Sequence, residues 1–191
     1  YTDVALAPLA LGALTKGVTV REMTTAYATF PNNGVYRYAR TYVKVLDSQG
    51  NVVLDNTQKT HNAMKKTTAW NMTMLLQNAV NAGTGTPARL TGMNVAGKTG
   101  TTSDDHDRYF AGYTPYYTAA VWIGYNHNAS IRANGNPAAQ LWKKVMSEAH
   151  ENLPNQNFNG STADMTQVTV CTRTGLLQGP GCTDVQTVWV A

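Results

Sequence analysis

Residues 95–102 of this chain read VAGKTGTT, and this stretch indicates both a strand and a binding surface. It begins apolar and then places one cation, Lys98, beside the hydroxyl groups of Thr99 and Thr101. Its glycines lack a Cβ, so a second backbone can lie close and pair with the strand, as a peptide does when it extends a sheet. Because an ammonium group attracts an anion and hydroxyls hydrogen-bond to it, the stretch suits a peptide-like ligand that carries a carboxylate.

The tripeptide Lys-Thr-Gly in this stretch is one of three signatures of penicillin-binding proteins and class A β-lactamases. Alone, it is also compatible with an ordinary strand or turn that contains glycine. Further blocks surround it, in this order: residues 9–19 (LALGALTKGVT), 26–30 (AYATF), 84–86 (TGT), 108–115 (RYFAGYTP) and 120–125 (AVWIGY). From about residue 4 to about residue 150, the sequence resembles the transpeptidase domain of class A (bifunctional) penicillin-binding proteins.

The resemblance implies a peptidoglycan D,D-transpeptidase, an enzyme that cross-links the bacterial cell wall. In that reaction a serine takes the acyl group from a D-Ala-D-Ala stem peptide, releases D-Ala, and passes the acyl group to an amine of a second stem peptide. β-Lactam antibiotics block such enzymes by acylating the same serine. The expected ligands are therefore peptidoglycan stem peptides and β-lactams, and the chemistry requires no metal and no organic cofactor.

The resemblance also implies roles for the residues of the motif. Lys98 matches the lysine that helps to set the electrostatics of the nucleophile pocket, and Thr99 and Thr101 match the hydroxyl positions that hold the substrate carboxylate. The backbone N–H of Thr101 would supply one donor of an oxyanion hole. Gly100 would let the two backbones come close, and Thr102 would extend the strand.

The nucleophile of this family is not in the sequence. The family uses the serine of Ser-x-x-Lys and a second signature, Ser-x-Asn, and both precede Lys-Thr-Gly. Neither pattern is formed by the serines of this chain, which are Ser48, Ser103, Ser130, Ser147 and Ser161. We therefore expect the nucleophile in an N-terminal part of the same enzyme, present as a separate chain. That part would also hold the membrane anchor, which places the domain at the extracytoplasmic face of the bacterial cell membrane.

Composition favours a globular protein with a polar, weakly charged surface. The 191 residues suffice for one domain and a small appendage. Charged residues make up 14% of the chain, and the net charge of +4 favours an anionic partner such as a wall polymer or a membrane surface. The basic residues form no stripe, which argues against a nucleic-acid partner. No apolar run approaches the length of a membrane span, and no signal peptide is visible.

Hydrophobic periodicity predicts the elements of the fold. They are helices at 19–30, at 67–82 and from 136 onward, a hairpin of 42–46 with 52–54, and three antiparallel strands at 93–102, 108–114 and 118–125. Thr19 and Glu22 have the spacing of a capping box, and Asn136 with Pro137 is a typical helix start. The resemblance implies an α+β fold (a three-layer α/β arrangement), with an antiparallel sheet flanked by helices as in serine β-lactamases and penicillin-binding transpeptidases.

The same periodicity predicts which side chains are buried. The second helix is expected to bury Met72, Leu75, Leu76, Ala79 and Val80. The last helix is expected to bury Leu141, Trp142, Val145, Met146 and Ala149. Trp122 and Tyr125 are also expected in the core.

The C-terminal region has a different composition. We expect residues 1–151 to form the C-terminal part of the transpeptidase domain, 152–164 a polar linker, and 165–191 a small β-rich appendage with strands at 166–172 and 185–190. Cys171 and Cys182 enclose a turn-rich loop, which a disulfide would stabilise by roughly 2–3 kcal/mol. Two reduced, partly buried thiols are the alternative. Two cysteines without further Cys or His nearby do not make a zinc site.

Residues 104–107 (DDHD) crowd carboxylates and an imidazole together. We favour a solvated loop at the rim of the binding cleft over a metal site, because adjacent residues of a turn point in different directions. Two other functions stay open. A serine β-lactamase uses the same Lys-Thr-Gly strand, and a non-catalytic module that binds stem peptides or the wall would need no nucleophile.

Overall fold

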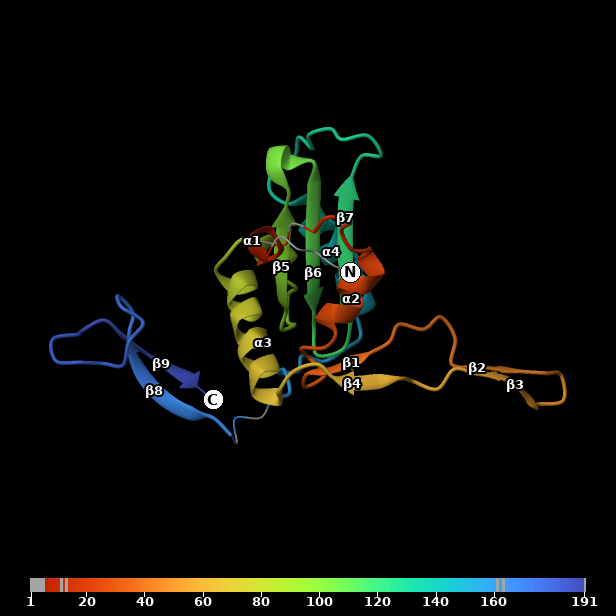
Figure 1. The fold of residues 1–191 in the computed structure, drawn as a ribbon, viewed down its shortest axis with the longest axis horizontal. Coiled ribbons are helices and arrows are strands. Elements are labelled where there is room, and N and C mark those ends of the chain that lie inside the picture. Colours follow the sequence, from red (N-terminus) through yellow and green to blue (C-terminus); the bar gives the residue numbers. More distant parts are fainter. Residues whose placement is uncertain (1–5, 11, 13, 161, 163, 191) are drawn as a thin grey trace.

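The computed structural model of the chain describes residues 6–10, 12, 14–160, 162 and 164–190. The helices are α1 (Leu6–Ala10), α2 (Val20–Tyr27), α3 (Lys66–Asn81) and α4 (Pro137–Ala149), with 3₁₀ turns η1 (Thr86–Ala88) and η2 (Ser103–Asp105). The strands are β1 (Val35–Arg37), β2 (Lys44–Leu46), β3 (Val52–Asp55), β4 (Thr60–Asn62), β5 (Ala96–Thr101), β6 (Asp107–Tyr113), β7 (Thr118–Gly124), β8 (Thr166–Cys171) and β9 (Val185–Val190). Figure 1 shows a central body from which two hairpins extend to opposite sides.

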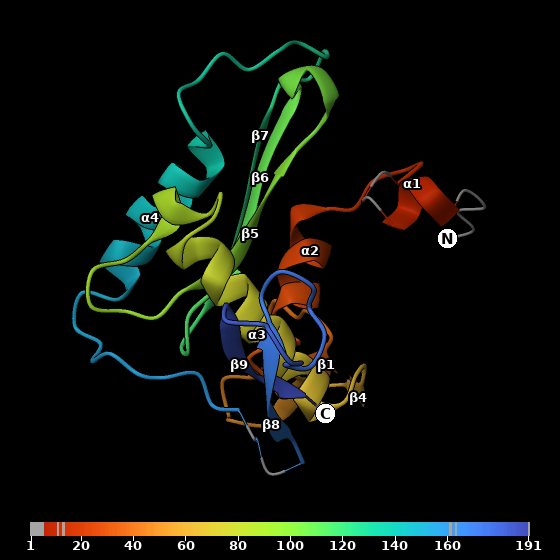
Figure 2. The same ribbon diagram turned by 90° about the vertical axis from the view of Figure 1, so that its left-hand side faces the viewer.

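Strands β5, β6 and β7 form the sheet of the body, antiparallel and in that order. Figure 2 shows this sheet close to edge-on, with α4 on one side and α2 on the other. Helix α3 packs against β5. The structure thus confirms the expected antiparallel sheet between helices, including the order of its three strands.

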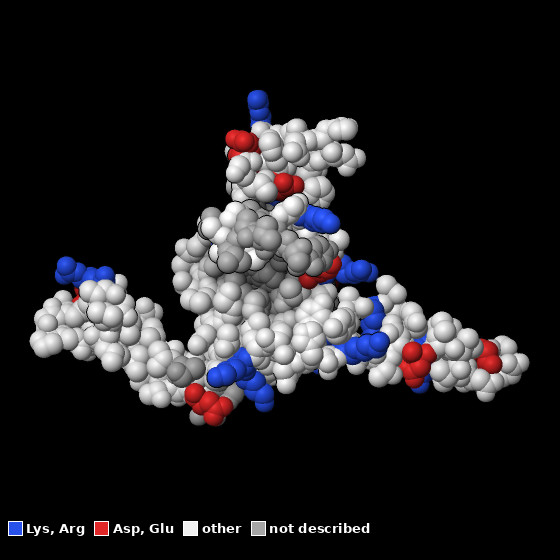
Figure 3. Space-filling model, viewed as in Figure 1, with Lys and Arg blue, Asp and Glu red and all other residues white. Residues whose placement is uncertain are grey.

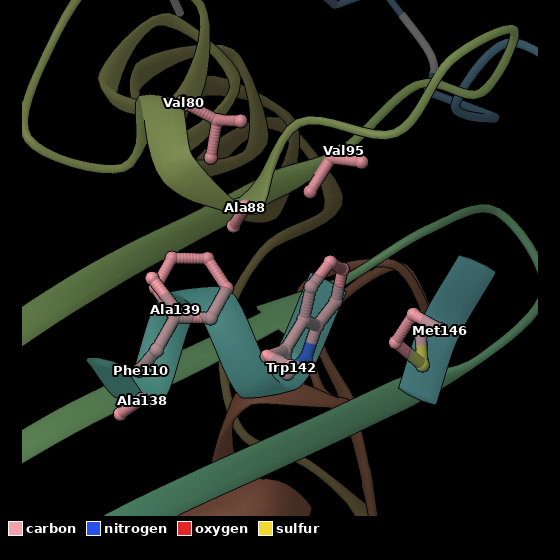
Figure 4. Close-up of a cluster of buried hydrophobic side chains, with 8 residues drawn as sticks. All are labelled: Val80, Ala88, Val95, Phe110, Ala138, Ala139, Trp142 and Met146. Carbon is pink, nitrogen blue, oxygen red and sulfur yellow. The ribbon is translucent and has the colours of Figure 1, made fainter. Parts of the chain in front are cut away.

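A first hydrophobic cluster fills the space between α4 and the sheet (Figure 4). Phe110 of β6 and Trp142 of α4 are fully buried, with ring centroids 5.1 Å apart. The indole N–H of Trp142 donates to the Ala119 carbonyl oxygen at 3.0 Å, so burial of the ring leaves no polar atom unpaired. The other members of this cluster are Val80, Ala88, Val95, Ala138, Ala139 and Met146.

A second cluster lies on the opposite side of the sheet, where Tyr27 of α2 packs against it. Its buried members are Leu76, Ala96, Tyr113 and Phe158. The Thr73 hydroxyl donates to the Ala69 carbonyl oxygen (2.9 Å), so the Tyr113 hydroxyl is the donor in its own 2.9 Å hydrogen bond to Thr73.

Local sequence signals fix where two helices begin. The Thr19 hydroxyl accepts from the Glu22 N–H at 3.2 Å, and the Glu22 carboxylate accepts from the Thr19 N–H at 2.8 Å. These bonds from Thr19 lower the pKa of Glu22. The Asn136 side chain accepts from the Ala139 N–H at 3.0 Å, and Pro137 begins α4. Both predicted helix starts are therefore confirmed.

The predicted buried faces are partly wrong. The side chains of Met72, Leu75, Leu141, Val145 and Ala149 are exposed, and Ala79 is half-buried. Small and β-branched residues bring α3 close to the sheet instead: its buried residues are Thr67, Ala69, Thr73, Leu76 and Val80. Helix α4 likewise buries one narrow stripe, formed by Ala138, Ala139, Trp142 and Met146. A helix that packs on one face of a sheet buries only the stripe of side chains in contact with that sheet. Apolar residues outside this stripe are therefore exposed to solvent.

Trp122 and Tyr125 are also exposed, at 42% and 58%, and do not belong to the core. The Trp122 indole donates to the Asp107 carboxylate at 2.8 Å, which holds the ring over the end of the sheet. A large aromatic residue at the end of a strand can cover polar groups there rather than enter the interior.

The C-terminal segments extend beyond the sheet. Strands β8 and β9 pair in a hairpin, in which Cys171 and Cys182 form a disulfide. Before it, residues 151–160 have no helix or strand, but Phe158 packs on Tyr113 with ring centroids 5.4 Å apart. This part of the expected linker therefore lies against the body, whereas positions 161 and 163 lie outside the described residues. The division at 151 and 165 stays a prediction.

Candidate functional site

Strand β5, with Lys98, Thr99, Gly100 and Thr101, lies at an edge of the sheet, because β6 is its one strand neighbour in the described part of the chain. The N–H of Thr102 donates to the Asp107 carbonyl oxygen across the β5–β6 pair at 3.2 Å. Backbone groups alternate in direction along a strand, so the N–H groups of Thr101 and Thr99 point away from β6. The free edge therefore presents donors to which an extended peptide could pair.

The cation and the hydroxyls reach this edge from opposite faces of the sheet. Ala96 belongs to the second cluster, on the α2 side, and the alternation of a strand places Lys98 on that side and Thr99 and Thr101 on the α4 side. The Lys98 ammonium nevertheless donates to the Thr99 carbonyl oxygen at 3.0 Å and lies 3.5 Å from the Thr99 hydroxyl. Its charge thus sits beside the first of the two hydroxyls.

Both hydroxyls have partners outside the Lys-Thr-Gly motif, which the sequence does not mark as site residues. The Thr99 hydroxyl is 2.7 Å from that of Thr84, in the turn after α3. The Thr101 hydroxyl accepts from the Arg108 guanidinium at 3.2 Å, and Asp105 holds Arg108 by an ion pair of 3.1 Å. The Thr101 proton is thereby left to donate to an anion. The signal for Arg108 is the antiparallel register, which sets it opposite Thr101.

Thr102 and the acidic loop have structural partners. The Thr102 hydroxyl accepts from the Asp107 N–H at 2.8 Å and donates to the Asp107 carboxylate at 3.0 Å, which closes the turn between β5 and β6. Asp105 is paired with Arg108, as described above. Asp104 and Asp105 belong to the η2 turn, and Asp107 begins β6. Within the described ranges, no three His, Cys, Asp or Glu side chains are grouped as metal ligands.

Two glycines of β5, Gly97 and Gly100, lie opposite residues of β6. A Cβ on Gly97 would lie 2.6 Å from the Phe110 ring and 2.8 Å from the Ala111 carbonyl oxygen, so Gly97 is required for β5 to pack on β6. A Cβ on Gly100 would lie 3.1 Å from the Cβ of Tyr109. Tyr109 itself is partly buried in this sheet, and this burial raises the pKa of its phenol group. Close packing within the sheet thus accounts for Gly97, a reason that the sequence reasoning did not consider.

Comparison with known proteins identifies relatives of this chain. Residues 2–147 match the family model described as penicillin binding protein transpeptidase domain. The chain is 41% identical over 150 residues to penicillin-binding protein 1A of Clostridium acetobutylicum, which covers 78% of this chain and 18% of that protein. It is 37% identical over 152 residues to penicillin-binding protein 1F of Bacillus subtilis, which covers 75% of this chain and 21% of that protein. The chain therefore spans about a fifth of the length of these relatives.

Solved structures give the same result for the fold. Penicillin-binding protein 1A from Haemophilus influenzae superposes with a TM-score of 0.79 at 19% identity, over 95% of this chain and 33% of that one. Penicillin-binding protein PonA1 from Mycobacterium tuberculosis superposes with a TM-score of 0.64 at 28% identity, over 73% of this chain and 40% of that one. Together with the match over residues 2–147, these likenesses show that the chain belongs to the transpeptidase domain family of the class A penicillin-binding proteins.

Proposed function

We propose that this chain supplies the substrate-binding strand of a peptidoglycan D,D-transpeptidase, and that β5 binds the carboxylate end of a D-Ala-D-Ala stem peptide. The observation that carries the proposal is the free edge of β5, with Lys98 beside Thr99, and Thr101 braced by Arg108. Two cations and two hydroxyls suit a carboxylate, and the outward N–H groups suit the backbone of a peptide. A β-lactam, which also carries an acid beside an amide, would bind in the same place.

The proposed reaction uses the N–H of Thr101 as one oxyanion donor. When a serine hydroxyl attacks the peptide carbonyl, negative charge develops on the carbonyl oxygen, and a donor already aimed at it lowers the barrier. The bond to the terminal D-Ala then breaks and the leaving amine takes a proton. The acyl group on the serine finally passes to an amine of a second stem peptide. Gly100 leaves room along the edge for the bound backbone, and Thr102 fixes the end of the strand.

The nucleophile and the membrane anchor would come from an N-terminal part of the enzyme, as a separate chain that completes the domain. The greater length of the relatives supports further segments in the enzyme. Within the described residues, no helix has the length and apolar character to cross a bilayer. In this proposal the assembled domain works at the extracytoplasmic face of the bacterial cell membrane.

A chimera tests the proposal. Residues 1–150 of this chain would replace the matching segment of penicillin-binding protein 1A from Clostridium acetobutylicum, and the purified protein would be treated with a fluorescent penicillin. We expect covalent label on the serine of the Ser-x-x-Lys motif. Lys98→Ala should slow labelling at least about tenfold, since it removes a charge-assisted contact to the acid group. Lys143→Ala, a matched change on the exposed face of α4, should label at the parental rate.

Equal labelling of the Lys98→Ala and Lys143→Ala variants would contradict the role of β5, provided that circular dichroism shows both to be folded. Rapid release of the label would favour a β-lactamase. Saturable binding of a stem peptide to the chimera without any acylation would favour a non-catalytic binding module.

A further inference from the structure

The β2–β3 hairpin joins the body through two segments, residues 38–43 and 56–59, which we call the neck. Figure 1 shows both segments connecting the β1–β4 pair to the hairpin. The neck holds a pocket of about 400 Å³, lined by residues 38–40 and 56–59. A smaller pocket of about 190 Å³ shares Ala39, Arg40 and Asn56 with it and adds Arg21 of α2.

Hydrogen bonds between the two segments fix the shape of the neck pocket. The Tyr38 N–H donates to the Lys59 carbonyl oxygen at 3.1 Å. The Gln58 side chain bridges the carbonyl oxygens of the same two residues, at 2.9 and 3.0 Å. The Arg40 guanidinium donates to the Asn56 carbonyl oxygen at 2.8 Å. One N–H of Arg40 is thereby committed, and its other donors are oriented by that bond.

Two of the cations that line the pockets, Arg40 and Lys59, have no acidic partner in the described part of the chain. Lys44 with Asp55 and Arg108 with Asp105 are the ion pairs of the described residues, and Arg21 interacts electrostatically with the Glu22 carboxylate. Asp55 itself accepts from the Thr57 hydroxyl at 3.0 Å. Figure 3 shows Lys and Arg side chains gathered where the hairpin on the right joins the body. Uncompensated cations around a concave site attract an anion.

One wall of the neck pocket is aromatic. Tyr38 is 51% exposed, yet its ring is held against Tyr36 and His61, with centroids 5.2 and 5.7 Å away. An exposed ring of fixed orientation, beside cations, offers apolar contact to whatever is attached to the anion. An inorganic ion would contact the cations alone, whereas an anion that carries a carbon skeleton would contact both the cations and the Tyr38 ring.

We propose that the neck pocket binds a phosphodiester of a polyol or sugar. The phosphate oxygens lie between Arg40 and Lys59, and the polyol or sugar lies on Tyr38. The fork of a guanidinium matches phosphate geometry, and an ammonium group opposite it can engage a further oxygen. The same chemistry occurs in the headgroup of an anionic phospholipid and in a free polyol-phosphate polymer.

Titration of the full chain with glycerophosphoglycerol, a phosphodiester of two glycerols, tests this inference by NMR. We expect saturable chemical-shift changes of the Arg40, Lys59 and Tyr38 signals. Inorganic phosphate should bind more weakly than glycerophosphoglycerol, and the Tyr38→Ala variant should lose this preference for the phosphodiester. Lys59→Gln should raise the Kd at least about tenfold, since it removes one charge-assisted contact. It leaves the bonds to the Lys59 carbonyl oxygen in place, so the neck should keep its shape. Lys143→Gln should bind as the parent does.

Vesicles of phosphatidylglycerol, compared with phosphatidylcholine, identify the source of the ligand. Binding of the free phosphodiester and of phosphatidylglycerol, both weakened by Lys59→Gln, supports the pocket with a lipid headgroup as one source. Binding of the free phosphodiester alone supports the pocket with a soluble polymer as the source. Absence of saturable binding to either, or an equal effect of Lys143→Gln, would overturn the proposal in favour of diffuse charge.

Discussion

The hydroxyl of Tyr113 is buried between α3 and the sheet, where it donates to Thr73. Burial raises the pKa of Tyr113 well above its ordinary value, because the interior disfavours the phenolate. The folded state therefore holds this proton more tightly than the unfolded state does. The stability that Tyr113 contributes is complete below the unfolded pKa of about 10 and is lost as the pH rises above it.

Replacement of Tyr113 by Phe should consequently have opposite effects at two pH values. At pH 8 the Tyr113→Phe variant should unfold more easily by about 1 kcal/mol, because the hydrogen bond to Thr73 is lost. Above pH 10 the parent should lose up to about 1.4 kcal/mol per pH unit relative to the variant, so the two stabilities should cross near pH 11. Urea denaturation at pH 8 and pH 11 measures both values. Tyr117→Phe, at a half-exposed ring, is the control, and a stability gap that does not change with pH would contradict the argument.

The residues of the candidate site divide into those that sequence can indicate and those that it cannot. Lys98, Thr99 and Thr101 follow one another in a motif, so their chemistry is readable from the sequence. Thr84 and Arg108 lie outside the motif, 15 and 7 residues from their partners Thr99 and Thr101, and reach the site through a turn and through strand register. Polar contacts of this kind depend on the path of the backbone in the folded chain, which a short sequence motif does not determine.

At the scale of elements, the pairing of β5 with β6 depends on a missing side chain. Gly97→Ala would place a methyl group among the Phe110 ring, the Ala111 carbonyl oxygen and Gly112, all of them buried. The strands would have to separate, and we expect a loss of about 2 kcal/mol in the free energy of unfolding. Gly179→Ala adds the same methyl group in open space and should leave stability unchanged. Chemical denaturation of both variants measures the difference, and equal stabilities would show that β5 can move away from β6 without cost.

The elements themselves were largely predictable, because their signals are local. The capping box at Thr19 and the Asn136 cap need only neighbours in sequence, and both are present. The buried faces were less predictable: Leu75 is 66% exposed, whereas Thr73 is buried. A prediction from hydrophobicity alone would bury Leu75 and expose Thr73. The stripe that a helix buries depends on how closely it approaches the sheet, and Thr73 with Ala69 permits a close approach that Leu would not.

At the scale of the whole molecule, two hairpins of different construction extend from one body (Figure 1). All seven strand residues of the β2–β3 hairpin are exposed, and its anchor is the hydrogen-bonded neck. The β8–β9 hairpin has an internal crosslink between Cys171 and Cys182. A two-stranded hairpin is at best marginally stable in water, so the crosslink should matter for the order of this hairpin. The direction in which each hairpin leaves the body was not predictable, because in the part of the chain that the structure describes neither hairpin packs an apolar face on the sheet.

Replacing Cys171 and Cys182 together by Ser should separate the stability of the C-terminal hairpin from that of the body. Without the crosslink, the hairpin should lose roughly 2–3 kcal/mol, as expected for a loop of this length. Limited proteolysis should then cut within residues 172–184, while the main thermal transition stays within about 2 °C of the parent, because the two core clusters contain neither cysteine. The parent treated with a phosphine reductant should behave like the variant. A drop of several degrees in the main transition would show instead that the hairpin and the body unfold as one unit.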